Sequence, residues 1–197
     1  MSKMKIAVTG GIGTGKSTVL KYIQEMGYPV FSCDEIYKEV IQTTSYIEAV
    51  QNRFPSVVID GKIQRKDLSD IVFHNPAALA VLNKIAHPLI MKELLKQMQA
   101  CDNEIVFAEV PLLFEGEFEA LFDKVIILKR DNQERISSVQ KRDGLTSTEV
   151  EQRINVQFDH FSNENLPRIK KCNAIILENN NLSKMKDDLN HIISQFL

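Results

Sequence analysis

The stretch Gly10-Gly11-Ile12-Gly13-Thr14-Gly15-Lys16-Ser17 matches the pattern G-x-x-x-x-G-K-[ST] at every position. Glycines allow consecutive backbone N–H groups to turn toward a phosphate chain, in a conformation that side chains would obstruct. The helix expected after the loop directs its positive N-terminus at the same phosphates. In this pattern the lysine bridges the β- and γ-phosphates and the serine hydroxyl binds Mg²⁺. The stretch therefore predicts a P-loop that binds a nucleoside triphosphate. The residues expected to contact the triphosphate are Gly11, Gly13, Thr14, Gly15, Lys16, Ser17 and Thr18.

Short β-branched runs alternate with longer helical patterns along the chain, which is typical of a parallel α/β sheet. The P-loop lies between the first run and a helix expected from about Gly15 to Met26, which Gly27 ends. Apolar residues three or four apart over 182–196 predict a terminal helix that faces the core. The predicted strands are Ile6–Thr9, Pro29–Ser32, Ile105–Val110, Lys124–Leu128 and Ala174–Leu177. We predict a three-layer α/β/α P-loop NTPase fold of the nucleotide-kinase type, with a parallel five-stranded sheet.

The predicted strands are unevenly spaced along the chain. Residues 35–102 carry helical stripes and no convincing strand, so we expect a helical insertion between two strands of the sheet. Residues 131–171 are charged, helical and rich in Arg and Lys, and they predict a lid; an ordinary crossover connection is the alternative. The core of a single domain is then expected at 1–34, 103–130 and 172–197.

Composition limits the possible partners. A length of 197 residues fits one globular domain. With 24 Lys and Arg against 26 Asp and Glu, the net charge of −2 argues against general nucleic-acid binding. No apolar run approaches the ~20 residues of a membrane helix, and the N-terminus does not read as a signal peptide. The three cysteines are widely spaced and form no metal-binding pair. We therefore expect a cytoplasmic protein with no nucleic-acid or membrane partner, and the composition implies no protein partner.

Two acids follow predicted strands, at the sheet edge where open α/β folds bind ligands. Asp34 comes directly after Pro29–Ser32. It could accept the proton of a substrate hydroxyl during attack on the γ-phosphate, or it could simply cap the next helix. Glu109 lies near the end of Ile105–Val110. It could hold Mg²⁺ through water or make a structural hydrogen bond.

Two further residues carry open alternatives. Arg142 lies in the basic 131–171 segment, where an arginine could neutralise transition-state charge or be a solvated surface charge. His87 precedes Pro88 at the start of a predicted helix, where a capping role is the alternative. The chain lacks the N-K-x-D motif of GTPases, and the third strand ends in a single acid rather than the paired acids of motor ATPases. A small-molecule kinase is therefore favoured.

The same residues, with several further segments, resemble the dephospho-CoA kinase family over nearly the whole chain. The P-loop with Thr9 is similar to the family's T-G-G-I-G-S-G-K-S, and Cys33-Asp34 stands where the family has D-A-D. The other matching segments are Gln64-Arg65, Ile71-Val72-Phe73, Ala86-His87-Pro88-Leu89-Ile90, Val110-Pro111-Leu112-Leu113-Phe114-Glu115 and Lys141-Arg142-Asp143-Gly144-Leu145-Thr146. The fourth of these resembles the family's V-P-L-L-F-E strand end and the last resembles its lid.

The resemblance implies transfer of the γ-phosphate of MgATP to the ribose 3′-hydroxyl of dephospho-CoA. It implies that Lys16 is catalytic, that Asp34 is the general base, and that Arg142 is a lid arginine over the ATP phosphates. The residues implied to face dephospho-CoA are Thr9, Asp34, Arg65, His87 and Leu112. Two alternatives stay open: another small-molecule or nucleoside monophosphate kinase, and a non-catalytic ATP-binding switch.

The chain departs from the family pattern at three points. The D-A-D triplet reads Ser32-Cys33-Asp34 and keeps only its second acid. Ser138 stands where the family often has a second lid arginine, and Arg135 lies about one turn earlier. The usual A-D-x-V-I-x-N strand reads Asn173-Ala174-Ile175-Ile176-Leu177-Glu178-Asn179. The lid and the adenine side of the site are where this chain is expected to differ.

Overall fold

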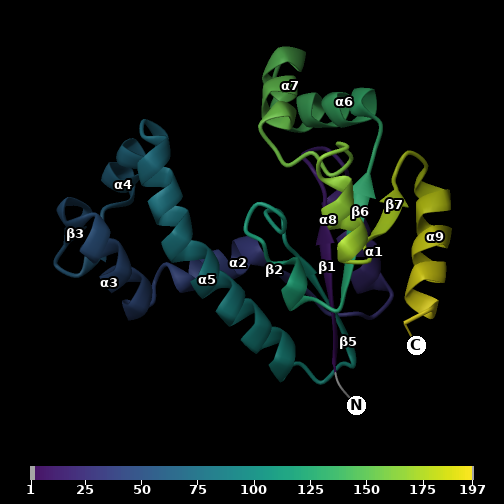
Figure 1. Cartoon of the computed structure of the whole chain (residues 1–197), viewed down its shortest axis with the longest axis horizontal. Coiled ribbons are helices and arrows are strands. Elements are labelled where there is room, and N and C mark those ends of the chain that lie inside the picture. The colour runs from purple at the N-terminus through teal and green to yellow at the C-terminus, as the bar shows by residue number, and fades with distance from the viewer. Residues whose placement is uncertain (1–2, 197) are drawn as a thin grey trace. The chain divides into compact units, whose positions relative to one another are not determined.

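The computed structural model of the chain describes residues 3–196 and forms two compact units (Figure 1). The first unit contains Met1–Phe31 and Cys101–Leu197, and the second contains Ser32–Ala100. No helix among the described residues is both long and apolar enough to cross a membrane.

A five-stranded sheet forms the centre of the first unit. Its order is β2-β5-β1-β6-β7, and the pairs β1–β5, β1–β6 and β6–β7 are parallel. The strands are β1 Met4–Thr9, β2 Val30–Ser32, β5 Ile105–Glu109, β6 Lys124–Lys129 and β7 Ile175–Glu178. Each is rich in β-branched residues, which suit a pleated surface covered on both faces. The predicted parallel five-stranded sheet and the α/β class are confirmed.

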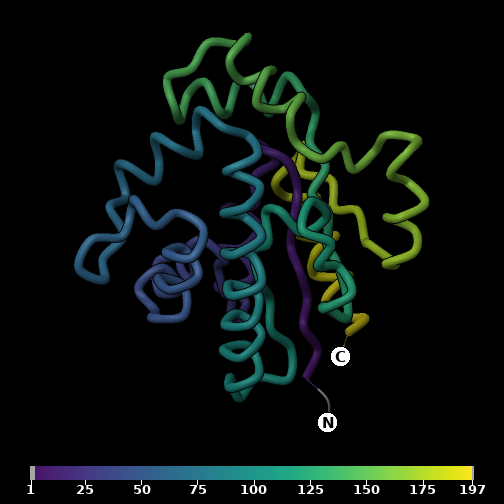
Figure 2. Tube along the Cα trace, turned by 60° about the vertical axis from the view of Figure 1, so that its left-hand side comes forward, coloured from purple at the N-terminus to yellow at the C-terminus, as the bar shows by residue number. Residues whose placement is uncertain are grey.

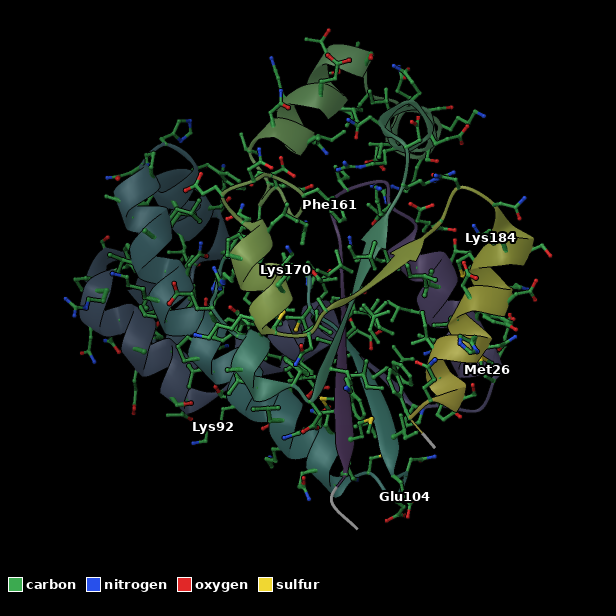
Figure 3. The ribbon with its side chains drawn as sticks, turned by 45° about the vertical axis from the view of Figure 1, so that its right-hand side comes forward. Met26, Lys92, Glu104, Phe161, Lys170 and Lys184 are labelled. Atoms are coloured by element: carbon green, nitrogen blue, oxygen red, sulfur yellow. The ribbon has the colours of Figure 1, made fainter. Side chains whose placement is uncertain are left out.

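Helices cover both faces of this sheet. Helices α1 (Lys16–Glu25) and α9 (Leu182–Ser194) lie on one side, and α8 (Leu166–Lys171) lies on the other (Figure 3). The buried side chains that α1 and α9 contribute to the core with the strands are Val19, Leu20, Ile23, Met185, Leu189 and Ile193. Burying an aliphatic side chain of this size contributes about 1.5–3 kcal/mol. The core therefore fixes α1, and with it the loop from β1.

The segment 131–171 contains α6 (Asn132–Asp143), α7 (Ser147–Asn155) and α8. Helices α6 and α7 lie beyond the carboxyl ends of β1 and β6 (Figures 1 and 2). Local signals set their bounds: the Asp131 carboxylate accepts from the backbone of Gln133, and Thr146 forms a capping box with Glu149. A small apolar cluster joins the two helices, and Ile12 of the P-loop packs against it. This packing brings the segment onto the P-loop.

The second unit is mainly helical. Its helices are α2 Cys33–Val40, α3 Thr44–Arg53, α4 Arg65–Phe73 and α5 Pro76–Ala100. It also holds a hairpin of β3 (Val58–Ile59) and β4 (Lys62–Ile63), so the prediction that residues 35–102 contain no strand was wrong. The turn residues Asp60 and Gly61 both have positive φ, 49° and 70°, as the tight hairpin turn requires. The Asp-Gly pair between two apolar runs was the signal for it.

Helix α5 corrects a second expectation. It runs continuously through His87 and Pro88, so the prediction that a helix starts at His87 was wrong. A proline inside a helix removes one backbone hydrogen bond and is a probable boundary in any sequence reading. Here four buried apolar residues on both sides of the proline, Ala86, Ile90, Met91 and Leu94, hold the helix together. Tertiary packing thus overrides the local preference.

Candidate functional site: the P-loop and the residues around it

The P-loop connects β1, the central strand, to α1. Gly13 and Gly15 have positive φ, 76° and 87°, which lets the backbone curl around a concave centre. Helix α1 begins at Lys16, so the positive end of its dipole lies at the loop. The Lys16 ammonium donates to the carbonyls of Gly10 at 2.7 Å and Gly11 at 3.2 Å. Ser17 and Thr18 are exposed in the same turn.

Neighbouring elements close in on the glycines. A Cβ on Gly15 would lie 2.2 Å from Nδ2 of Asn179, which donates to the Thr14 carbonyl at 2.8 Å. A Cβ on Gly13 would lie 2.7 Å from the carbonyl oxygen of Arg135. The glycines therefore serve two purposes, a left-handed backbone and close approach of β7 and α6.

We expect Gly15→Ala to destabilise the protein by roughly 2–4 kcal/mol, because a strained backbone and a displaced buried amide act together. Gly144→Ala is the matched control: Gly144 also has positive φ, 70°, but nothing lies within 4 Å of its added Cβ. Urea unfolding of both variants measures the difference. Equal losses in the two variants would show that the Asn179 contact is unimportant.

Three polar side chains bind the P-loop backbone: two from the segment 131–171 and one from Arg130, which directly precedes it. Arg135 Nε donates to the Ile12 carbonyl at 2.9 Å, and the Ile12 N–H donates to Gln157 Oε1 at 2.7 Å. Arg130 Nη1 donates to the Gly13 carbonyl at 3.2 Å. The site therefore carries two guanidinium groups directly on the loop that is expected to hold phosphates.

The predicted lid arginine, Arg142, is paired with a neighbouring carboxylate. Arg142 lies in the last turn of α6, exposed, and makes a bidentate pair with Asp143 at 2.7 and 2.9 Å. This pair holds the pKa of the Asp143 carboxyl below its usual range. Ser138 instead accepts a hydrogen bond from Arg130 Nη1 at 2.7 Å. The guanidinium group of Arg130, which follows β6, therefore contacts the position where the family often has an arginine.

The strand ends supply further polar groups. Glu109 ends β5 and pairs in register with Val8 of β1, so its half-buried carboxylate belongs to the same sheet edge as the P-loop. Thr9 ends β1, is fully buried, and its hydroxyl oxygen has no hydrogen-bond partner among residues 3–196. Leu112, in the turns after β5, is 45% exposed.

Asp34 lies in the first turn of α2 and is exposed. The N-cap position belongs to Ser32, which makes no side-chain capping bond. The capping alternative for Asp34 therefore does not hold. A carboxylate in a first turn still interacts favourably with the helix dipole, as does the neighbouring Glu35.

The second unit places Arg65 at a cavity. Arg65 begins α4 and lines an apolar cavity of about 340 Å³ together with Tyr37, Tyr46, Leu68 and Phe73. Phe73 is 80% exposed, which is unusual for a large aromatic ring. His87 lies half-buried in the middle of α5. Arg65 is thus a cation beside an apolar hollow, whereas His87 belongs to a helix interior.

His160 is buried in the first unit, only 7% exposed. Its ring packs edge-on against Phe114 and Phe158, at centroid distances of 5.4 and 5.2 Å. The pKa of His160 falls from 6.5 to about 4, mainly because the ring is buried; the charges of Lys16 and Arg135 act in the same direction, and Asp159 opposes the shift. The imidazole is therefore neutral at neutral pH.

This burial predicts a pH-dependent stability. As the pH falls from 6.5 to about 4, the unfolded chain protonates His160 before the folded chain does, so stability is lost across that window. The loss expected from this group is about 3 kcal/mol. Urea unfolding at several pH values should show a shallower acid dependence for His160→Gln than for the native chain. His191→Gln, in an exposed turn of α9, is the control; equal slopes for all three proteins would contradict the assignment.

Several site residues had no place in the sequence interpretation. Arg130 lies two residues after the predicted strand Lys124–Leu128 and directly after β6, so the strand-end rule that selected Asp34 could have found it. Asn179 follows β7 in the same way. Gln157 and His160 carry no local signal, because the packing of the segment 131–171 on the P-loop brings them there.

A P-loop that follows the central strand of a parallel sheet, with two arginines on its backbone carbonyls, places the chain among the P-loop kinases in fold. The dephospho-CoA kinase family model matches residues 4–184, and the chain belongs to that family.

Individual relatives agree with this membership. The chain is 35% identical to the dephospho-CoA kinase of Fusobacterium nucleatum over 187 residues, which cover 94% of each chain. The crystal structure of TT1252 from Thermus thermophilus is similar with a TM-score of 0.80 and 27% identity, covering 100% of both chains. The dephospho-CoA kinase of Campylobacter jejuni is similar with a TM-score of 0.66 and 27% identity, over 98% of this chain and 96% of that one.

Proposed function

We propose that the chain transfers the γ-phosphoryl group of ATP to the ribose 3′-hydroxyl of dephospho-CoA, giving CoA and ADP. The observation that carries the proposal is the P-loop itself, with Lys16 and the α1 N-terminus beneath two arginines, in a member of the dephospho-CoA kinase family. Phosphoryl transfer needs positioning and charge neutralisation more than covalent chemistry, and this arrangement supplies both.

The phosphate side uses the backbone and the cations. The backbone N–H groups of the loop around Gly13 and Gly15 and the positive end of α1 hold the phosphate chain. Lys16 leaves the Gly10 and Gly11 carbonyls for the β- and γ-phosphates, which bind an ammonium more strongly than neutral carbonyls do. Arg142 exchanges Asp143 for the transferring group when its segment closes over the nucleotide.

A magnesium ion fits the oxygen donors that the chain offers. The Ser17 hydroxyl, exposed at the start of α1, would be a direct ligand, and the Glu109 carboxylate at the end of β5 would hold the ion through water. Both are hard oxygen donors of the kind that Mg²⁺ prefers. When bound, the ion neutralises charge on the β- and γ-phosphates.

The remaining predicted residues bind and activate the acceptor. Asp34 takes the proton of the 3′-hydroxyl as that oxygen attacks. Arg65, at the edge of an apolar cavity, pairs with an acceptor phosphate, while the cavity takes uncharged parts of the substrate. Thr9, His87 and Leu112 complete the acceptor side.

An ADP-release assay with and without dephospho-CoA tests this proposal, with AMP, dTMP and shikimate as competing acceptors. We expect ADP formation to depend on dephospho-CoA and to be slow with the other acceptors. Turnover that depends on AMP, dTMP or shikimate instead would keep the P-loop kinase and reject dephospho-CoA. Absence of ADP with every acceptor would favour a non-catalytic ATP-binding switch.

A further inference from the structure

A cavity of about 480 Å³ in the first unit lies against the P-loop residues Gly11 and Thr14. The end of β6, the start of α6 and residues 154–161 form the rest of its wall. Three cationic side chains line it: Lys129, Arg130 and Arg135. Such a wall suits an anionic ligand, and the adjoining glycine loop is the phosphate-binding element of the fold.

One wall residue, His160, has no role in the reaction as described above. Phe114 and Phe158 stack on each other with centroids 5.0 Å apart and an interplanar angle of 11°, and the His160 ring packs edge-on against both. Arg168 covers the same two rings at 5.4 and 5.7 Å and pairs with Glu119. The backbone N–H of Phe158 donates to Glu115. The imidazole is therefore held rigidly at the cavity wall.

His160 Nε2 is buried and has no hydrogen-bond partner among the described residues. Leaving a buried polar nitrogen unpaired costs roughly 1–3 kcal/mol, so native structures seldom do it without a reason. Arg130 Nε, on the same cavity wall, is a second buried nitrogen without a partner. Two orphaned nitrogens at one cationic cavity point to a ligand that offers acceptor oxygens.

The charges around His160 explain why it is neutral and what would change this. Those that act on it directly are Asp159 on its own segment, Lys16 on the P-loop and Arg135 on α6; Lys129 and Arg130 share the cavity wall. Cations thus outnumber acids, and they disfavour the imidazolium form. A polyphosphate carries several negative charges, and in this cavity it would offset these cations and favour the protonated ring.

We propose that His160 is a phosphate-binding residue: when a polyphosphate occupies the P-loop, the imidazole takes a proton from solvent and Nε2–H donates to a phosphoryl oxygen. The inference rests on the proposed function in taking the ligand to be the triphosphate of ATP. It adds to that function a residue from the segment 154–161 that binds the nucleotide. Nucleotide binding is then linked to the uptake of a proton.

The direct test follows the Cε1–H signals of the chain's four histidines by NMR as the pH is changed, with and without tripolyphosphate. His160→Gln identifies the His160 signal. We expect tripolyphosphate to raise the pKa of His160 by about one unit or more, with much smaller changes at His74 and His191. An unchanged His160 pKa at saturating tripolyphosphate would overturn the proposal and leave a bound water as the partner of Nε2.

Kinetics separate binding from a merely structural role. His160→Gln and His160→Phe remove the titrating nitrogen, and the phenylalanine keeps the ring packing against Phe114 and Phe158. We expect the KM for ATP to rise about tenfold in both variants, with kcat and the KM for dephospho-CoA nearly unchanged. A loss in His160→Gln that His160→Phe restores would assign His160 to packing alone. If the native chain forms no ADP with dephospho-CoA, the proposed function fails, but the tripolyphosphate titration still decides the role of His160.

Discussion

Lys16→Ala is expected to lower kcat by about 10³-fold or more. The ammonium reaches the loop centre from the first helical turn and contacts two of its carbonyls. In the transition state it neutralises charge on the phosphates. Removing a comparable electrostatic contact from other enzymes lowers the rate by about 10²- to 10⁵-fold. Measurement of kcat and of ATP affinity separates transfer from binding.

Lys21→Ala is the matched control for Lys16→Ala. Lys21 lies on the same helix with its side chain 77% exposed, at 4.0 Å from Glu25. We expect this variant to keep native kcat, since an exposed pair of this kind contributes at most about 1 kcal/mol to stability. Thermal unfolding checks that Lys16→Ala remains folded. A folded Lys16→Ala protein with near-native turnover would contradict the role of the P-loop in transfer.

Asp34→Asn is expected to lower kcat by about 10²- to 10⁴-fold, with little change in the KM for ATP. The amide is nearly isosteric with the carboxylate but cannot take the proton of the attacking hydroxyl. Because Asp34 is exposed and is not the N-cap of α2, its replacement costs only the dipole interaction, about 0.3–1 kcal/mol. Stability therefore stays close to native while transfer fails.

Glu35→Gln controls for the helix dipole, because Glu35 is the other exposed acid in the first turn of α2. If the dipole interaction were the only role of Asp34, the two variants would have the same small effects on stability and on kcat. A kcat of Asp34→Asn that matches that of Glu35→Gln would remove Asp34 from the mechanism.

Much of the fold was predictable because its signals are local. The β-branched runs mark the five strands, and the spacing of apolar residues marks α9. The P-loop pattern predicts its own backbone conformation, because its glycines Gly13 and Gly15 adopt the positive φ that other residues avoid. The errors arose where two local signals competed. Pro88 suggested a helix boundary inside α5. The helical pattern of the neighbouring residues outweighed the turn signal of Asp60-Gly61, so the short hairpin was missed.

The site was less predictable than the fold, for a physical reason. Strand ends meet at one sheet edge, so Asp34 and Glu109 could be selected from sequence order alone. Contacts made by the segment 131–171 depend on how its helices pack on Ile12, which no local pattern encodes. The family resemblance pointed to Arg142, whose role stays a prediction, and it gave no sign that Arg130 and Arg135 donate to the P-loop carbonyls.

The product formed from ATP and dephospho-CoA shows whether the chain phosphorylates the ribose 3′-hydroxyl. Mass spectrometry and ³¹P NMR of the reaction with the native chain would identify the product and the oxygen that carries the new phosphate. We expect one phosphoryl group on the ribose 3′-oxygen and one ADP for each CoA formed. Unmodified dephospho-CoA beside accumulating ADP, or a phosphate on any other oxygen, would contradict it.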